Sequence, residues 1–168
     1  MEQKHAGIVV AAGKGRRFGG DIPKQYLNLC GKPVLCHCLD VMEKSFLSEV
    51  VLVVAKGDED YCANEIVEKY HYAKVTEILA GGAERSQSVA NALNSLSKRE
   101  IPPDFVYIQD GARPFLTLSL LESLRDAALA SGASVAAKKV TDTIKTTDDG
   151  SFVKDNLDRS KLCAVQTP

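Results

Sequence analysis

Two stretches of the chain, far apart in the sequence, consist entirely of apolar residues. They are residues 8–12 (IVVAA) and 50–55 (VVLVVA). Continuous apolar runs of this length, rather than alternating ones, are typical of strands that other elements cover on both faces. Residues 75–79, 105–108 and 134–137 are weaker strand candidates and predict three further strands.

Segments with the helical spacing of apolar residues lie between these runs. The predicted helices are one that starts at Pro33, one over 59–70 with Asp58 as its cap, one over 85–97, and one that starts at the capping box of Ser119 and Glu122. The apolar face of the helix over 85–97 is expected to consist of Val89, Ala92, Leu93 and Leu96.

Strands and helices therefore alternate through most of the chain. This order predicts an α/β fold with a Rossmann-like, mainly parallel sheet and helices on both of its faces. After residue 137 the chain becomes polar and carries a TDDGS turn between two extended stretches. We expect a projecting β-hairpin arm at about 138–160, within a single domain that spans residues 1–168.

The charge balance limits the class of ligand. The 168 residues include 21 Lys and Arg against 22 Asp and Glu, which gives a formal net charge of −1. This balance argues against a general nucleic-acid binder, and we see no apolar run suited to a membrane span or a signal peptide. We therefore expect a cytoplasmic protein with no nucleic-acid or membrane partner, whose local basic clusters bind a small anion.

The cysteines indicate reduced thiols rather than a disulfide framework. There are five of them, an odd number at irregular spacing. Cys36, His37 and Cys38 lie close together, but the paired CxxC spacing of structural zinc sites is missing. We expect the cysteines of this segment to be buried thiols on the first helix.

The loop after the first strand, AAGKGRRF, has the composition of a phosphate-binding loop. Ligands of open α/β sheets bind at the carboxyl ends of the strands. The small residues of the loop, which let the backbone approach a ligand, are Ala11, Ala12, Gly13 and Gly15. Arg17 and Lys24 can add charge-assisted hydrogen bonds. A surface loop with solvated charges would have a similar composition, so the pattern alone leaves both interpretations open.

Two common phosphate motifs are absent at this position. A P-loop requires G-x-x-x-x-G-K-[ST], and the chain has no such spacing. A dinucleotide fingerprint requires G-x-G-x-x-G, but Phe18 stands where the third glycine would be. A hydride-transferring dinucleotide enzyme is therefore disfavoured.

The segment AAGKGRRFGGDIPKQYLNLCGKPVLCHCLD resembles the opening of the 2-C-methyl-D-erythritol 4-phosphate cytidylyltransferases of the non-mevalonate isoprenoid pathway. That family shows A-A-G-x-G-x-R-[MF], then P-K-Q-[YF]-L, then G-[KQ]-P-[IV]-L-x-H. The first piece is shared by a broader class of nucleotidyltransferases, whereas the PKQYL continuation is more specific. The resemblance implies the nucleotide-diphospho-sugar transferase type of α/β fold.

A second motif, GGAERSQSVANAL, begins at Gly81 and matches the family's G-G-x-x-R-x-x-S-V. By resemblance, Gly82 and Ala83 lie near the cytosine and Ser88 contacts the nucleotide. From the residues alone, an ordinary strand-to-helix turn capped by Ser86 or Ser88 is an equal alternative.

The third motif, YIQDGARPF, ends the strand at 105–108. Asp110 at a strand end could hold a ribose hydroxyl or Mg²⁺, and Arg113 could pair with a phosphate. An Asp–Arg ion pair within a turn is the alternative. The family shows H-D-[AS]-[AV]-R-P, so Gln109 and Gly111 are departures. By resemblance, Asp110 and Gly111 bind the nucleotide, and Asp110 and Arg113 bind the second substrate.

The last two motifs lie in and after the expected arm. VTDTIK matches the family's V-x-D-T-[IL]-K, and LDRSKLCAVQTP matches its R-x-x-L-x-x-x-Q-T-P. Taken singly, these would be solvated hairpin residues. The five motifs in family order imply that Thr143 and Arg159, from the arm of a neighbouring subunit, bind the erythritol phosphate. The resemblance thus implies a homodimer formed through the arm.

The reaction implied by the resemblance is nucleotidyl transfer from CTP to 2-C-methyl-D-erythritol 4-phosphate, with release of pyrophosphate. It implies Arg17, Lys24 and Arg159 as catalytic residues and Mg²⁺, or another divalent cation, as cofactor. The resemblance covers the whole chain, but the family continues past the Q-T-P motif and carries a second functional lysine there. We therefore expect the C-terminal part of the family domain to be absent from this sequence.

Two alternatives remain from the sequence. A ribitol-5-phosphate cytidylyltransferase shares the first loop, the PKQ motif and a DxxRP motif, although GGAERSQSV and VTDTIK are closer to the erythritol enzymes. A catalytically silent nucleotide-binding module would retain the loops without transfer, and the presence of Arg17 and Lys24 argues against it.

Overall fold

The computed structural model describes residues 3–13 and 22–165. The chain divides into two compact units, one up to Ser123 and the other from Leu124. The first unit holds the central sheet and the second holds short antiparallel strands, and each is described by itself. Among residues 3–13 and 22–165, every helix is too short or too polar to span a bilayer.

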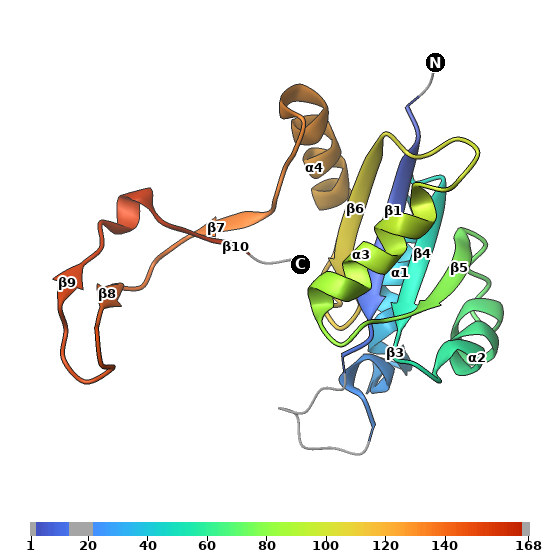
Figure 1. Cartoon of the computed structure of the whole chain (residues 1–168), viewed down its shortest axis with the longest axis horizontal. Coiled ribbons are helices and arrows are strands. Elements are labelled where there is room, and N and C mark those ends of the chain that lie inside the picture. The colour runs from blue at the N-terminus through green and yellow to red at the C-terminus, as the bar shows by residue number, and fades with distance from the viewer. Residues whose placement is uncertain (1–2, 14–21, 166–168) are drawn as a thin grey trace. The chain divides into compact units, whose positions relative to one another are not determined.

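A four-stranded parallel sheet forms the centre of the first unit (Figure 1). Its strands are β1 (His5–Ala11), β4 (Glu49–Val54), β5 (Val75–Ala80) and β6 (Phe105–Asp110), in the order β5-β4-β1-β6. The four strands predicted within residues 8–108 are therefore confirmed. The fifth is wrong, because residues 134–136 have no regular structure and only Ala137 belongs to a strand.

Helices cover both faces of this sheet (Figure 1). Side chains alternate between the faces, so Val9, Val50 and Leu52 pack with α1 (Val34–Lys44) on one side. Ile8, Val51 and Val53 pack on the other side against α3 (Arg85–Leu96). Burial on both faces is the reason that these strands are continuously apolar, and it confirms the predicted fold class.

The remaining helices of the first unit differ in detail from the sequence-based expectation. The segment predicted as a helix over 59–70 consists of a short α2 (Glu59–Tyr61) and a π-helical η3 (Cys62–Glu68). Asp58 precedes α2 as predicted, but its side chain makes no cap hydrogen bond and instead accepts one from the Tyr26 hydroxyl, at 2.9 Å.

Two predicted helix starts are shifted. Pro33 lies in β3 (Lys32–Pro33), which pairs with β2 (Asn28–Leu29), and α1 begins one residue later. The fourth helix, α4 (Leu118–Ser131), is not capped by the predicted Ser119 box. Thr117 caps it instead, because its Oγ1 accepts a hydrogen bond from the Leu120 N–H at 3.2 Å.

The buried face of α3 is also rotated from the predicted one. Leu93 is 41% exposed, whereas Ser88, Ala92 and Leu96 are buried. These three residues are spaced by four, which places them on one side of the helix. A polar residue, Ser88, thus occupies a position that the apolar pattern could not identify.

The burial of the cysteines follows the expectation for the first helix. Cys36 and Cys38 on α1 and Cys62 at the start of η3 are buried, whereas Cys30 and Cys163 are exposed. Burial raises the pKa of Cys38 to about 12 and that of Cys62 to about 11. The buried thiols therefore stay protonated at neutral pH.

Thiol labelling is expected to divide the cysteines into two classes. Only Cys30 and Cys163 should react quickly with a thiol reagent in native buffer, because the thiolate is the reactive form and the other three thiols are buried and protonated. Mass spectrometry after brief labelling, with and without denaturing guanidinium chloride, measures this. Fast native labelling of Cys38 would contradict the described core.

The second unit contains two antiparallel strand pairs. The strands β7 (Ala137–Lys139) and β10 (Cys163–Val165) form one pair, and β8 (Lys145–Thr146) and β9 (Asp155–Asn156) form the other. The TDDGS segment turns between β8 and β9 as predicted. Asp149 Oδ1 accepts hydrogen bonds there from the N–H groups of Ser151 and Phe152, at 2.8 and 3.2 Å. The hairpin expected for this part of the chain is therefore present.

Candidate active site

The candidate site lies where the parallel strands of the first unit end. The register aligns Ala11 with Val54 and Val54 with Ala80, and it aligns Val10 with Asp110. The carboxyl ends of all four strands are therefore level at one edge. The helix between β1 and β4, α1, packs on one face of the sheet. The helix between β5 and β6, α3, packs on the other face. The strand order thus reverses between β1 and β6, where open α/β sheets bind ligands.

The loop after β5 crosses the end of β4 and meets the end of β1. The Gly81 N–H donates to the Val54 carbonyl at 2.7 Å. A Cβ atom on Gly81 would lie 2.3 Å from the Ala12 Cβ and 2.9 Å from the Ser88 Oγ. Because no side chain fits into this space, glycine at position 81 is what lets the two loops touch.

Two side chains of α3 form hydrogen bonds with the backbone of the same loop. The buried Ser88 hydroxyl accepts from the Gly82 N–H and donates to the Glu84 carbonyl, both at 3.1 Å. Gln87 Oε1 accepts from the Ala83 N–H at 3.2 Å. Ser88 therefore fixes the loop's own backbone, although no side chain caps the start of α3. The predicted position of Gly82 and Ala83 near the cytosine stays a prediction. A direct contact of Ser88 with a nucleotide stays a prediction.

Asp110 lies between two arginines. Its Oδ1 accepts from Arg85 Nε at 2.9 Å, and its Oδ2 accepts from Arg113 Nε at 3.2 Å. The predicted Asp–Arg pair within the turn is therefore present. Arg85, the first residue of α3, was not predicted as a site residue. The sequence did contain a signal for Arg85, because this arginine directly follows a glycine-containing loop at the start of a predicted helix.

The turn after β6 packs closely on β1. The Gly111 N–H donates to the Val10 carbonyl at 2.8 Å, and a Cβ on Gly111 would lie 2.9 Å from Leu35 Cδ1 and 3.0 Å from the Ala11 Cβ. Buried Gln109 donates to the Arg113 carbonyl at 3.2 Å. The two departures from the family pattern thus occupy close-packed positions that hold Asp110 and Arg113 in place.

The predicted phosphate loop is only partly described. Ala11, Ala12 and Gly13 follow one another at the end of β1, whereas Gly15 and Arg17 lie outside the described residues. Lys24 begins a short 3-10 turn, η2 (Lys24–Tyr26), and is exposed. The next residue, Gln25, is buried and donates to the Ala11 carbonyl. Lys24 is therefore carried by a turn that is attached to the end of β1.

The second unit carries the two remaining predicted residues. Thr143 and Arg159 are both exposed. Arg159 Nη1 donates to the Thr141 carbonyl at 3.1 Å, which places Arg159 close to the segment that holds Thr143. Asp158 fixes the start of η4 (Arg159–Lys161) by accepting from the Ser160 N–H at 3.0 Å. The structure describes these residues only within their own unit, so their part in the site stays a prediction.

The described residues provide few side chains that could bind a metal ion. In residues 3–13 and 22–165, no three His, Cys, Asp or Glu side chains gather as a metal site. Asp110 is the predicted ligand, and both of its oxygens accept hydrogen bonds from guanidinium groups. If a divalent cation binds at this edge, Asp110 is the predicted ligand among the described residues, and phosphate oxygens would supply most of its other ligands.

Replacing Gly81 by alanine is expected to lower the free energy of unfolding by about 1–3 kcal/mol. The added Cβ would overlap Ala12, and the two loops would have to separate. Urea titration followed by circular dichroism measures the change. Gly13→Ala is the matched comparison, because no described atom lies within 4 Å of its Cβ position. Equal unfolding midpoints for the two variants would contradict the close contact of the loops.

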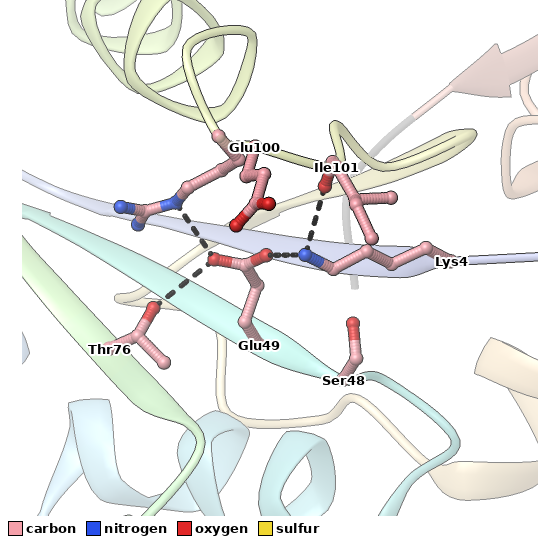
Figure 2. Close-up of a pocket in the computed structure, with 7 residues that line it drawn as sticks. Lys4, Ser48, Glu49, Thr76, Glu100 and Ile101 are labelled. Atoms are coloured by element: carbon pink, nitrogen blue, oxygen red, sulfur yellow. Dashed lines mark hydrogen bonds and ion pairs between the residues drawn. The ribbon is translucent and has the colours of Figure 1, made fainter.

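A second polar region lies at the opposite, amino-terminal edge of the sheet (Figure 2). A cavity of ≈ 420 Å³ opens there beside Lys4, Glu49 and Arg99. Figure 2 shows the Glu49 carboxylate between Lys4 and Thr76, and Lys4 Nζ lies 2.9 Å from one carboxylate oxygen. Arg99 Nε lies 3.2 Å from the other oxygen.

This second region is a structural network rather than the candidate site. Burial opposes the charge of Glu49, but the cations of Lys4 and Arg99 together outweigh it and lower the pKa of that carboxyl. The Lys4 ammonium also donates to the Ile101 carbonyl at 3.1 Å. These bonds join the start of β4 to the chain that follows α3. Arg99 Nη2 also lies 2.8 Å from a Glu77 carboxylate oxygen, so the two cations face two carboxylates.

The sequence comparisons place the chain among enzymes of one name. A model of the family described as IspD, 2-C-methyl-D-erythritol 4-phosphate cytidylyltransferase, matches residues 6–168. The 2-C-methyl-D-erythritol 4-phosphate cytidylyltransferase of Alkaliphilus metalliredigens (strain QYMF) is 45% identical over 162 residues, which are 96% of this chain and 66% of the relative. The protein of the same name from Clostridium novyi (strain NT) is 43% identical, over 98% of this chain and 70% of the relative. The chain thus spans about two thirds of the length of these relatives.

Solved structures support the same grouping. The 4-diphosphocytidyl-2C-methyl-D-erythritol synthase from Anaerococcus prevotii DSM 20548 superimposes with a TM-score of 0.79 at 27% identity, over 99% of this chain and 69% of that one. The 2-C-methyl-D-erythritol 4-phosphate cytidylyltransferase of Francisella tularensis gives a TM-score of 0.74 at 26% identity, over 99% and 71% of the two chains. These similarities confirm the nucleotidyltransferase type of α/β fold.

Proposed function

Because the chain belongs to the 2-C-methyl-D-erythritol 4-phosphate cytidylyltransferase family, a family of nucleotidyltransferase enzymes, we propose that it joins CTP and 2-C-methyl-D-erythritol 4-phosphate. The products are 4-diphosphocytidyl-2-C-methyl-D-erythritol, an isoprenoid precursor, and pyrophosphate. The observation that carries the proposal is the meeting of the loops after β1, β5 and β6 at one edge of the sheet. Glycine backbone and guanidinium groups lie side by side there, which suits two phosphorylated substrates.

The chemistry needs positioning more than proton transfer. An oxygen of the acceptor phosphate attacks the α-phosphorus of CTP, the new P–O bond forms, and the bond to pyrophosphate breaks. A phosphomonoester is already nucleophilic at neutral pH, so no strong general base is required. Catalysis then consists of alignment of the two phosphates and stabilisation of the charge that develops on the phosphorus oxygens.

We assign the described residues to these tasks by their place at the edge and by the family resemblance, and Gly15 and Arg17 by the resemblance alone. Arg17 and Lys24 stabilise the transferring phosphoryl group, and Asp110 with Arg113 orients the acceptor. The residues proposed to line the nucleotide are Ala11, Ala12, Gly13, Gly15, Gly82, Ala83, Ser88 and Gly111. Arg85 becomes part of this arrangement through its contact with Asp110.

A divalent cation such as Mg²⁺ completes the proposal. When bound, it would neutralise triphosphate charge and polarise the α-phosphorus. Asp110, a described carboxylate at this edge, could give it one oxygen, provided that one of the two arginines releases that oxygen. In this proposal, the guanidinium group that releases Asp110 binds a substrate phosphate instead.

We also propose that the enzyme acts in the cytoplasm as a homodimer, with Thr143 and Arg159 reaching the site of the neighbouring subunit. Exposed apolar side chains in the second unit support a partner surface, since Phe152 is 79% and Val153 is 64% exposed. Sedimentation of the complete protein at several concentrations tests the assembly. A strictly monomeric and fully active protein would refute the exchanged arm.

A pyrophosphate-release assay on the complete protein tests the proposed reaction. The protein is mixed with CTP, Mg²⁺ and either 2-C-methyl-D-erythritol 4-phosphate or ribitol 5-phosphate. Pyrophosphate is expected only with the erythritol substrate, and omission of the divalent cation should abolish it. Release with ribitol 5-phosphate alone would identify the other cytidylyltransferase. CTP binding without release from either acceptor would identify a nucleotide-binding module.

A further inference from the structure

Gln25 is a buried polar residue that none of the proposed catalytic steps uses. Its side chain is only 1% exposed, although it carries two N–H donors. The Nε2 atom donates to the Ala11 carbonyl at 2.8 Å and to the Gly13 carbonyl at 3.2 Å. One amide group therefore binds the backbone on both sides of Ala12, at the point where β1 becomes the loop.

The turn that carries Gln25 is anchored on its other side as well. The hydroxyl of the next residue, Tyr26, donates to Asp58 Oδ2 at 2.9 Å, and it lies 3.2 Å from Cys62 Sγ. Burial, together with these two neighbours, raises the pKa of Tyr26 well above its ordinary value, so the hydroxyl keeps its proton. The turn is thus attached to β1 through Gln25 and to α2 through Tyr26, while Lys24 is exposed.

We propose that Gln25 is a positioning residue for the nucleotide, which fixes the start of the phosphate loop and the Lys24 turn as one unit. This inference rests on the proposed function and deepens it. A loop that must cradle a triphosphate loses conformational freedom on binding. By binding two of its carbonyls before the ligand arrives, Gln25 removes part of that loss, and CTP binds more tightly.

The chemistry of the contact explains why glutamine is suited to this position. Both partners are carbonyl oxygens, which only accept hydrogen bonds. A glutamate side chain at position 25 would place carboxylate oxygens, which only accept hydrogen bonds, next to these two carbonyl oxygens. A methionine side chain would fill the same space but has no hydrogen-bond donor. Either replacement leaves two carbonyls at the loop start without their donor.

CTP affinity of the complete protein, measured by titration calorimetry, tests the proposal. Gln25→Glu is expected to weaken CTP binding by about tenfold, the scale of losing one net hydrogen bond with its partner left unsatisfied. The matched control is Gln3→Glu, which makes the same chemical change at an exposed residue just before β1. The control should bind CTP as the unchanged protein does.

Steady-state kinetics separate positioning from a loss of folding. For Gln25→Met, which avoids a buried charge, the KM for CTP should rise about tenfold while the KM for the acceptor stays within about twofold. Thermal unfolding shows that the protein is folded at the assay temperature. A general structural defect would instead change both KM values or lower the folded fraction.

Each outcome has a defined meaning. Weaker CTP binding in both Gln25 variants, with an unchanged Gln3 control, supports the positioning role. CTP binding equal to that of the unchanged protein in a folded Gln25→Met variant overturns that role and leaves the proposed reaction intact. Failure of the unchanged protein to bind CTP at all overturns the proposed function, and the inference with it.

Discussion

Replacing Lys24 by alanine is expected to lower kcat by on the order of 10²–10³, while the protein stays folded. Lys24 lies on a turn that Gln25 fixes to the end of β1, and its side chain is exposed at the start of that turn. A preorganised cation in this position stabilises charge that develops only in the transition state. The loss should therefore appear mainly in kcat rather than in the KM for CTP.

Pyrophosphate release at saturating substrate measures this effect, and circular dichroism verifies the fold. Lys98→Ala is the matched control, because Lys98 is an exposed lysine that follows α3 outside the site. Its kcat should be unchanged. If the folded Lys24→Ala variant retained near-normal turnover, Lys24 would have no role in the chemical step.

Replacing Asp110 by asparagine is expected to lower kcat/KM for the acceptor by about a hundredfold, the scale of displacing a group that orients a substrate. The carboxylate accepts from Arg85 and Arg113 on separate oxygens. Asparagine has no negative charge and directs an N–H₂ group toward one of the guanidiniums. The two arginines would then repel each other and lose their common anchor.

A double-mutant cycle with Arg85 shows whether the contact matters for the reaction. Arg85→Met in the Asp110→Asn background should add little to the loss, because the partner of Arg85 is already removed. The control is Asp104→Asn, since Asp104 accepts from the Lys4 backbone N–H and an asparagine carbonyl can do the same. Fully additive losses would mean that Arg85 and Asp110 act independently.

The two predictions concern the two halves of one site. In the proposed mechanism, Lys24 acts on the triphosphate of CTP and Asp110 orients the acceptor. The loop after β5 connects them, since Gly81 touches Ala12 and Arg85 reaches Asp110. Motions of this loop are therefore expected to affect both substrates.

Several features of the fold could be predicted from the residues alone because their signal is local. Two continuous apolar runs and two weaker strand signals indicated the four strands of the parallel sheet, and the TDDGS segment indicated the turn between β8 and β9. The weak run at 134–137 misled, because a short apolar stretch carries no information about whether a neighbouring strand is available to pair with it. Leu93 misled for a related reason, since apolarity alone does not say which side of a helix faces the sheet.

The sequence by itself determined the order of the four parallel strands and the main helices, the family, and the motifs from which the site is proposed. Only the tertiary structure decided which atoms meet: Arg85 with Asp110, Gly81 with Ala12, and the Gln25 amide with two loop carbonyls. The physical reason is one of range. The spacing of apolar residues indicates which side of a short segment is buried. A hydrogen bond between distant residues forms only when the strand register and the course of the loops bring donor and acceptor within about 3 Å of each other.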